Sequence, residues 1–105
     1  MPRRRLRLRI RGKVQRVGFR WFVRGTARRC ELAGWVKNNP DGTVELCVEG
    51  EEDCVARLRS AVAMGPEGAR VDAVETLEER VHVGEGGAGA GAGEDTLPYP
   101  FQMVR

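Results

Sequence analysis

The chain has 105 residues, a formal net charge of +3 and a hydrophobic fraction of 41%. This length suits one small domain with one core, and the sequence contains no apolar run of the roughly 18 residues that cross a membrane. The basic N-terminus lacks the apolar block of a secretory signal, and the three cysteines contain no Cys-x-x-Cys pair. We therefore expect a single domain over 1–105 that is cytoplasmic and monomeric, with free thiols rather than a disulfide framework or a zinc site.

Positive charge is concentrated in the first third of the chain. Twelve of the 18 basic residues precede Glu31, which is the first acidic residue. Such a field concentrates anions, and it fits either a phosphorylated small molecule or nucleic acid. For a single arginine outside the first loop, the simpler interpretation is the solvated face of a strand or a helix.

The first half of the chain predicts a strand, a helix and a hairpin, in that order. Leu6–Ile10 alternates between apolar and basic residues, as in a half-buried strand. Between 20 and 32, apolar residues recur at helical spacing. A second strand begins at Trp35, and the turn Asn-Pro-Asp-Gly over 39–42 joins it to an alternating third strand over 44–49.

The second half of the chain predicts a helix, a long strand and a short closing strand. Acidic residues at 51–53 mark the start of the helix, and the Gly-Pro pair at 65–66 ends it. Apolar residues over 71–77 indicate the fourth strand. The Gly/Ala-rich segment over 84–95 is expected to be flexible, and 101–104 has the pattern of a short final strand.

This order of elements predicts a ferredoxin-like α/β sandwich. Strand, helix, strand, strand, helix, strand is the split βαβ pattern (βαββαβ), which belongs to the α+β class. Each predicted helix has a single apolar stripe, so both helices can cover one face of an antiparallel sheet. The fold can then bring the strand before the 39–42 turn against the loop that precedes the first helix.

The loop over 14–20, between the first strand and the first helix, is the most informative segment (Val-Gln-Arg-Val-Gly-Phe-Arg). A loop that enters a helix presents unpaired backbone N–H groups, and the helix dipole adds positive potential, so phosphate binds there readily. Arg20 adds a guanidinium that matches phosphate oxygens in two directions at once. We predict a phosphate-binding loop, to which Gln15 and Gly18 contribute mainly through backbone N–H groups. Its residues are Gln15, Arg16, Val17, Gly18 and Phe19, with Arg20 as the fixed cation.

Two spaced motifs in this chain resemble the acylphosphatase family. The first is Gly-x-Val-Gln-x-Val-Gly-Phe-Arg over 12–20, and the second is Gly-Trp-Val-x-Asn-x-x-Asp-Gly-x-Val-Glu over 34–45. The similarity runs from about residue 6 to residue 74, and two motifs in this order are more specific than a lone glycine loop. The resemblance implies the same ferredoxin-like fold and an enzyme that hydrolyses the carboxyl–phosphate bond of acyl phosphates.

The resemblance also implies two catalytic roles: Arg20 and the loop bind the phosphate, and Asn38 orients the attacking water. The chemistry suits a site this sparse, because an acyl phosphate expels a carboxylate of pKa about 4 and needs no general acid. Charge stabilisation on the phosphoryl oxygens and a water held in line are then sufficient, and an amide can both accept from and donate to that water. Asn39 is the competing candidate, but the spacing from Trp35 favours Asn38, for which turn chemistry is the simpler alternative. We expect neither a metal nor a cofactor, and we expect the bound phosphate to help accept the proton of the water.

Arg16 occupies a position where the family usually has glycine. Glu31, at the end of a helix, occupies a position where the family often has glycine. If the position of Arg16 needs a positive φ, arginine there costs on the order of 1–2 kcal/mol and distorts the loop. Alternatively, Arg16 adds charge beside the phosphate and the site tolerates the strain. We expect reduced but real activity.

Two alternative functions stay open. One is a catalytically weakened homologue that binds phosphate or carbamoyl phosphate without turnover, for which Arg16 is the support. The other is a polyanion- or nucleic-acid-binding ferredoxin-like module, which the basic N-terminal third supports but which lacks the aromatic pattern of RNA-binding sheets. The expected partner is a small-molecule acyl phosphate. Its acyl group is not identified, because acetyl, carbamoyl and glyceroyl phosphates share the same phosphoryl group.

Overall fold

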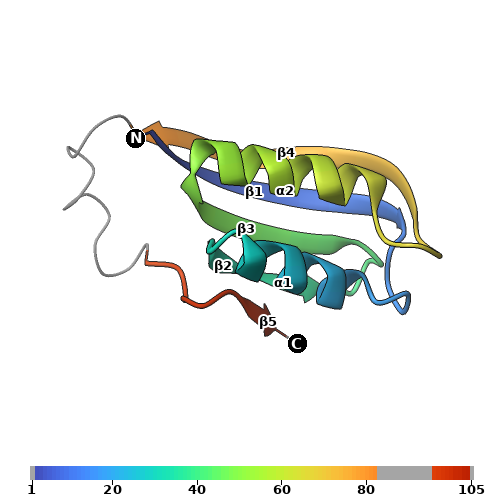
Figure 1. The fold of residues 1–105 in the computed structure, drawn as a ribbon. Coiled ribbons are helices and arrows are strands. Elements are labelled where there is room, and N and C mark those ends of the chain that lie inside the picture. Colours follow the sequence, from blue (N-terminus) through green and yellow to red (C-terminus); the bar gives the residue numbers. More distant parts are fainter. Residues whose placement is uncertain (1, 83–95, 105) are drawn as a thin grey trace.

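Five strands and two helices make up the described part of the chain, which in this computed structural model comprises residues 2–82 and 96–104. They occur in the predicted order (Figure 1). None of the helices in those ranges is long and apolar enough to span a membrane. The segment 84–95, which is predicted to be flexible, lies outside the described residues. The elements are β1 (Arg3–Lys13), α1 (Phe19–Arg29), β2 (Ala33–Asn38), β3 (Val44–Glu51), α2 (Glu52–Met64), β4 (Arg70–His82) and β5 (Gln102–Val104).

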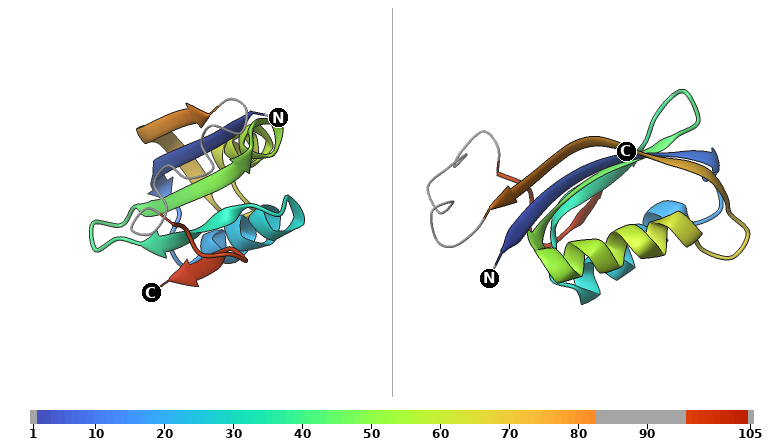
Figure 2. Two further views of the ribbon diagram at one scale, coloured as in Figure 1. Left: turned by 90° about the vertical axis from the view of Figure 1, so that its left-hand side faces the viewer. Right: turned by 90° about the horizontal axis from the view of Figure 1, so that it is seen from above.

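The strands form one sheet in the order β4-β1-β3-β2-β5. The strands β1 to β4 pair antiparallel, β1 with both β3 and β4 and β2 with β3, so the predicted ferredoxin-like sandwich is confirmed. The strand β5 pairs in parallel with β2, which makes the complete sheet mixed rather than wholly antiparallel. Both helices cover one face of the sheet, and the other face, called the open face below, carries no helix from residues 2–82 or 96–104 (Figure 2).

The core lies between the sheet and the two helices. Alternate residues of β1 (Leu6, Leu8 and Ile10) are fully buried, as are the alternate apolar residues of β3. Burying each such side chain contributes about 1.5–3 kcal/mol, which is why the helices stay on this face. The buried helix residues that belong to the same core are Phe19, Val23 and Ala27 of α1 and Val55, Leu58 and Val62 of α2.

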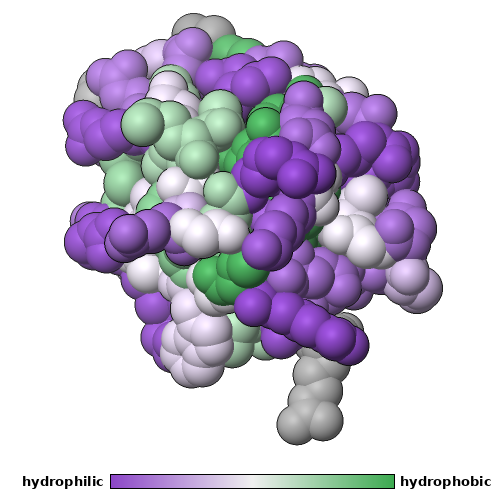
Figure 3. Space-filling model, turned by 90° about the vertical axis from the view of Figure 1, so that its right-hand side faces the viewer, coloured by the Kyte–Doolittle hydropathy of each residue, from purple (hydrophilic) through white to green (hydrophobic). Residues whose placement is uncertain are grey.

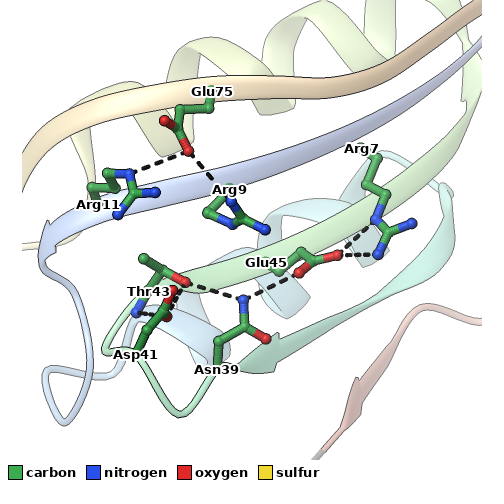
Figure 4. A network of polar contacts seen from close by, with 8 residues as sticks. All are labelled: Arg7, Arg9, Arg11, Asn39, Asp41, Thr43, Glu45 and Glu75. Carbon is green, nitrogen blue, oxygen red and sulfur yellow. Dashed lines mark hydrogen bonds and ion pairs between the residues drawn. The ribbon is translucent and has the colours of Figure 1, made fainter.

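The open face carries the residues of β1 that alternate with the buried ones, and four arginines among them form ion pairs. These four arginines contact carboxylates of the two neighbouring strands, β3 and β4, and Figure 4 shows Arg7, Arg9 and Arg11. The pairs and their N–O distances are Arg5–Glu49 (3.2 Å), Arg7–Glu45 (2.6 Å), Arg9–Glu75 (3.8 Å) and Arg11–Glu75 (3.2 Å). The basic stripe of β1 is therefore matched by acidic side chains on both sides.

The helix α1 ends at Arg29 rather than at the predicted residue 32, because the chain reverses there. Glu31 has a φ of 56°, in the left-handed region. The N–H of Leu32 donates to the carbonyl oxygen of Ala27 at 2.9 Å, and the N–H of Glu31 donates to that of Arg28 at 3.1 Å. These two bonds form a Schellman motif, whose left-handed position favours glycine. The motif turns Leu32 into the core, where it is 1% exposed.

The C-terminal segment returns to β2 and α1. Phe101 is fully buried in the core, and Nε of Arg28 in α1 donates to its carbonyl oxygen at 2.9 Å. The N–H of Gly34 in β2 donates to the carbonyl oxygen of Pro98 at 2.8 Å. These contacts hold β5 at the edge of the sheet beside α1 (Figure 1).

Candidate functional site

The backbone of the predicted phosphate-binding loop suits an anion. Arg16 and Gly18 have positive φ values of 65° and 76° on either side of Val17, so the sign of φ alternates, which is the backbone pattern of an anion-binding nest. The first hydrogen bond of α1 runs from the N–H of Phe22 to the carbonyl oxygen of Gly18 at 3.0 Å. The amides of 19–21 precede this bond and have no acceptor within the helix. The loop and the start of α1 together form a concave set of amide donors.

A cavity of about 220 Å³ lies where this loop meets the start of α1 and the end of β2. Figure 3 views the molecule from that end of the sheet, where hydrophilic side chains surround smaller hydrophobic patches. Five of the predicted site residues line the cavity, whereas Gln15 and Val17 do not. The lining residues are Val14, Arg16, Gly18, Phe19, Arg20, Trp21 and Asn38.

Arg20 is held in place by the C-terminal strand. Its Nη1 donates to the carbonyl oxygen of Val104 in β5 at 3.0 Å. Within the described residues Arg20 forms no ion pair with a carboxylate, unlike the arginines of the open face. A guanidinium has five N–H donors in a planar fork, so several of them stay available for an anion. A contact between residues 20 and 104 has no local signal in the sequence, so the sequence does not predict it.

The two neighbouring asparagines have different surroundings. Asn38 lines the cavity, and its Oδ1 is buried without a hydrogen-bond partner in the described part of the chain. Asn39 points elsewhere: its Nδ2 donates to Oγ1 of Thr43 at 3.0 Å and to Oε1 of Glu45 at 3.1 Å (Figure 4). Buried polar atoms are nearly always paired, so the Oδ1 of Asn38 is complementary to a donor such as a bound water. The geometry therefore favours Asn38 over Asn39 as the residue that meets a ligand.

Gln15 connects the loop to the hairpin that carries Asn38. Its Nε2 donates to the carbonyl oxygens of Asn39 at 2.8 Å and Thr43 at 2.9 Å. The sequence predicts that Gln15 acts mainly through its backbone N–H, because no spacing rule reveals a side-chain contact across 24 residues. These two bonds fix the distance between the phosphate-binding loop and the end of β2.

Arg16 and Val17 lie on opposite sides of the loop. Val17 is half-buried and packs against the core, whereas Arg16 is exposed and lines the cavity. Arg16 has a φ of 65°, so the positive φ on which the predicted strain depends is present. An arginine in this region costs on the order of 1–2 kcal/mol relative to glycine. Strain of this kind is therefore located directly at the cavity.

Two carboxylates stabilise the hairpin that follows Asn38. Burial raises the pKa of Glu45, but hydrogen bonds from Asn39 and Arg7 outweigh it, so the pKa lies below its usual 4.5. Hydrogen bonds from the Thr43 side chain and backbone N–H lower the pKa of Asp41 below 3.8. Both groups are therefore ionised at neutral pH, and they hold the turn in its folded shape.

Potential metal ligands and thiols are scattered. Within the described residues, no three His, Cys, Asp or Glu side chains lie close enough together to hold a metal ion. The three cysteines are free thiols, as predicted. Burial raises the pKa of the Cys47 thiol to about 11, so this thiol is inert at neutral pH. None of the three lines the cavity.

Comparisons with known proteins agree with this architecture. Residues 6–86 match the family model for acylphosphatase. The acylphosphatase of Nitratidesulfovibrio vulgaris (strain DP4) is 46% identical over 84 residues, which span 80% of this chain and 82% of the relative. That of Thermococcus kodakarensis is 48% identical over 79 residues, 75% of this chain and 87% of the relative. The crystal structure of acylphosphatase from Bacillus subtilis matches over 100% of both chains, with a TM-score of 0.74 and 31% identity. The chain therefore belongs to the acylphosphatase family.

Proposed function

We propose that this protein is an acylphosphatase, which hydrolyses acyl phosphates to a carboxylate and inorganic phosphate. The observation that carries the proposal is the meeting of Arg20 from α1 and Asn38 from β2 in one cavity, beside a loop with the backbone pattern of an anion-binding nest. Membership of the family supports the same reaction.

The phosphoryl group is proposed to bind in the concave loop. Amides of the loop and of 19–21 donate to its oxygens, and the guanidinium of Arg20 covers two of them at once. In the transition state negative charge spreads over these oxygens, and donors that are already oriented stabilise it without reorganisation. The hydrogen bond from Arg20 to Val104 keeps the guanidinium in position.

Asn38 is proposed to hold the attacking water. The water donates one hydrogen bond to the Oδ1 of Asn38 and attacks phosphorus in line with the bond to the acyl oxygen. The P–O bond to the carboxylate breaks, the carboxylate leaves with the electron pair, and an oxygen of the phosphoryl group accepts the proton of the water. The carboxylate is stable as an anion at neutral pH, so no general acid is needed.

The nucleic-acid alternative loses support from the open face. That alternative needs a basic surface free to bind phosphates, but four arginines of β1 contact Glu45, Glu49 and Glu75. The positive φ of Arg16 still supports the alternative of a catalytically weakened homologue. We infer activity that this strain lowers without abolishing it.

The hydrolysis of benzoyl phosphate, followed by the loss of ultraviolet absorbance, tests the proposal. Turnover by the wild-type protein that persists in excess chelator supports an acylphosphatase that needs no metal. Complete loss that Mg²⁺ restores contradicts the metal-free route. A silent protein that still binds inorganic phosphate indicates the weakened homologue, and steeply salt-dependent binding of an oligonucleotide indicates the polyanion-binding module.

We also propose that the chain acts as a single-domain monomer in the cytoplasm. The charged, ion-paired open face supports a monomer, because stable protein interfaces have apolar centres. The three free thiols support the location, because cysteines stay reduced in the cytoplasm. Sedimentation equilibrium at micromolar concentrations tests the first point, and a mass twice that of the chain contradicts it.

A further inference from the structure

The side chain of one residue in the cavity wall, Trp21, takes no part in the proposed phosphoryl chemistry, in which only the backbone amide of this residue is used. Trp21 lines the cavity together with Arg20 and Asn38, and 62% of its surface is exposed. We propose that Trp21 forms the acyl-binding subsite, so that the protein prefers acyl phosphates with a planar apolar group, such as aromatic acyl phosphates, to short aliphatic ones. The inference rests on the proposed acylphosphatase function and extends it to the substrate class.

The core does not account for Trp21. The buried stripe of α1 contains Phe19, Val23 and Ala27, and Trp21 lies outside it, on the solvent side of the first turn. Other large apolar side chains are exposed too, for example Met64 at 83%. Among the residues that line the cavity, Trp21 is the large apolar side chain that is exposed, because Val14 and Phe19 are each only 1% exposed.

The ring of Trp21 is held in place by Arg24, one helical turn further along α1. The guanidinium carbon of Arg24 lies 5.1 Å from the ring centroid, which is a cation–π contact. A ring that a cation covers on one face keeps its other face and its edge available for a ligand. An indole with few rotatable bonds also loses little entropy when an acyl group packs against it.

The burial of the two ends of the cavity agrees with this placement. In an in-line displacement the water and the leaving oxygen lie on opposite sides of phosphorus. The Oδ1 of Asn38, which would bind the water, is fully buried, whereas Trp21 is mostly exposed. The acyl group therefore points away from Asn38, toward the open mouth of the cavity where Trp21 lies.

The test compares two substrates rather than one rate. The kcat/KM values for benzoyl phosphate and acetyl phosphate are measured for the wild type and for Trp21→Ala, Trp21→Phe and Met64→Ala. Aromatic stacking of typical strength predicts that the benzoyl-to-acetyl ratio falls about 3- to 10-fold in Trp21→Ala and is largely kept in Trp21→Phe. Met64→Ala, which removes an exposed apolar side chain outside the cavity, leaves the ratio unchanged. The inhibition constant of inorganic phosphate stays the same in all four proteins, because phosphate does not reach the subsite.

The outcomes separate this inference from the proposed function. A wild type that hydrolyses neither substrate overturns the proposed function and the inference with it. A wild type that hydrolyses both, with the same benzoyl-to-acetyl ratio in Trp21→Ala, overturns only the inference. An equal loss for both substrates in Trp21→Ala also overturns it, since that result assigns Trp21 a structural role.

Discussion

The arginines of the open face and those at the start of α1 are the same residue type in opposite situations. On the open face, Arg7 and Arg9 of β1 contact carboxylates of the neighbouring strands. At the cavity, Arg20 is bonded to a backbone carbonyl, and Arg16 forms no ion pair within the described residues. Basic residues that already have acidic partners organise the sheet, whereas a positioned cation without one is available to an anionic substrate. The neighbours of a charge, rather than the number of charges, thus distinguish a site from a surface.

Among the variants that test this comparison, Arg20→Ala is expected to have the largest effect on activity. Loss of a donor that acts in the transition state lowers kcat/KM by about 10²- to 10³-fold. Arg9→Ala, which removes an arginine of the open face, changes kcat/KM by less than about 2-fold, because an exposed ion pair contributes little. Initial rates with benzoyl phosphate measure both variants. Equal losses in the two variants would contradict the distinction between paired and available arginines.

The two asparagines extend the comparison to a pair of adjacent residues. Asn38→Ala is expected to lower kcat by about 10²-fold with little change in the melting temperature, since its Oδ1 has no protein partner within the described ranges. Asn39→Ala removes two hydrogen bonds of the hairpin and is expected to lower the free energy of unfolding by about 1 kcal/mol. Rates and thermal unfolding are recorded on the same samples. A reversed pattern would assign the water to Asn39.

Arg16→Gly tests whether strain at the cavity lowers activity. Glycine removes about 1–2 kcal/mol of backbone strain from the folded state. It also gives the unfolded chain more conformational entropy, which offsets part of this stabilisation, so we expect the free energy of unfolding to rise by about 0.5–1 kcal/mol. We also expect kcat/KM to rise by a few-fold, because the loop amides are then better placed. An unchanged or lower kcat/KM would show instead that the charge of Arg16 assists the substrate.

Glu31→Gly is the matched control for Arg16→Gly. Glu31 has a φ of 56°, close to the 65° of Arg16, but it caps α1 far along the chain from the phosphate-binding loop. The same gain of about 0.5–1 kcal/mol in unfolding free energy is expected, with kcat/KM unchanged. Urea titrations of both variants check the stability, and a change in kcat/KM for Glu31→Gly would show that strain relief alone affects the rate from a distance.

The smallest expected effect concerns the acid stability of the hairpin. The pKa of Glu45 is lowered in the folded state, so its interactions contribute stability above the usual pKa of 4.5, and this stability is lost as the pH falls through the lower folded value. Unfolding free energy measured from pH 7 down to pH 3 is therefore expected to fall less steeply for Glu45→Gln than for the wild type. Parallel curves would mean that Glu45 does not couple protonation to folding.

The sequence predicted the elements with strong local patterns. The alternation of Leu6–Ile10, the turn over 39–42 and the two amphipathic helices each depend on residues a few positions apart, and all of them are present. The end of α1 was predicted too late because the left-handed Glu31 carries no glycine signal. Contacts between distant residues gave no signal at all, as with Arg20 and Val104 or Gln15 and Thr43. Five residues that line the cavity could therefore be named from the sequence, but the contacts that position them could not.

The most direct test of this account is an NMR titration of the ¹⁵N-labelled protein with inorganic phosphate, which locates binding without depending on turnover. We expect the backbone amide signals of 16–21 and the side-chain amide signal of Asn38 to shift and saturate together. Signals of the open face, on β1 and β4, are expected to stay in place. Saturable shifts on β1 and β4 with none in 16–21 would contradict the account, because the ion-paired arginines would then be the site that binds phosphate.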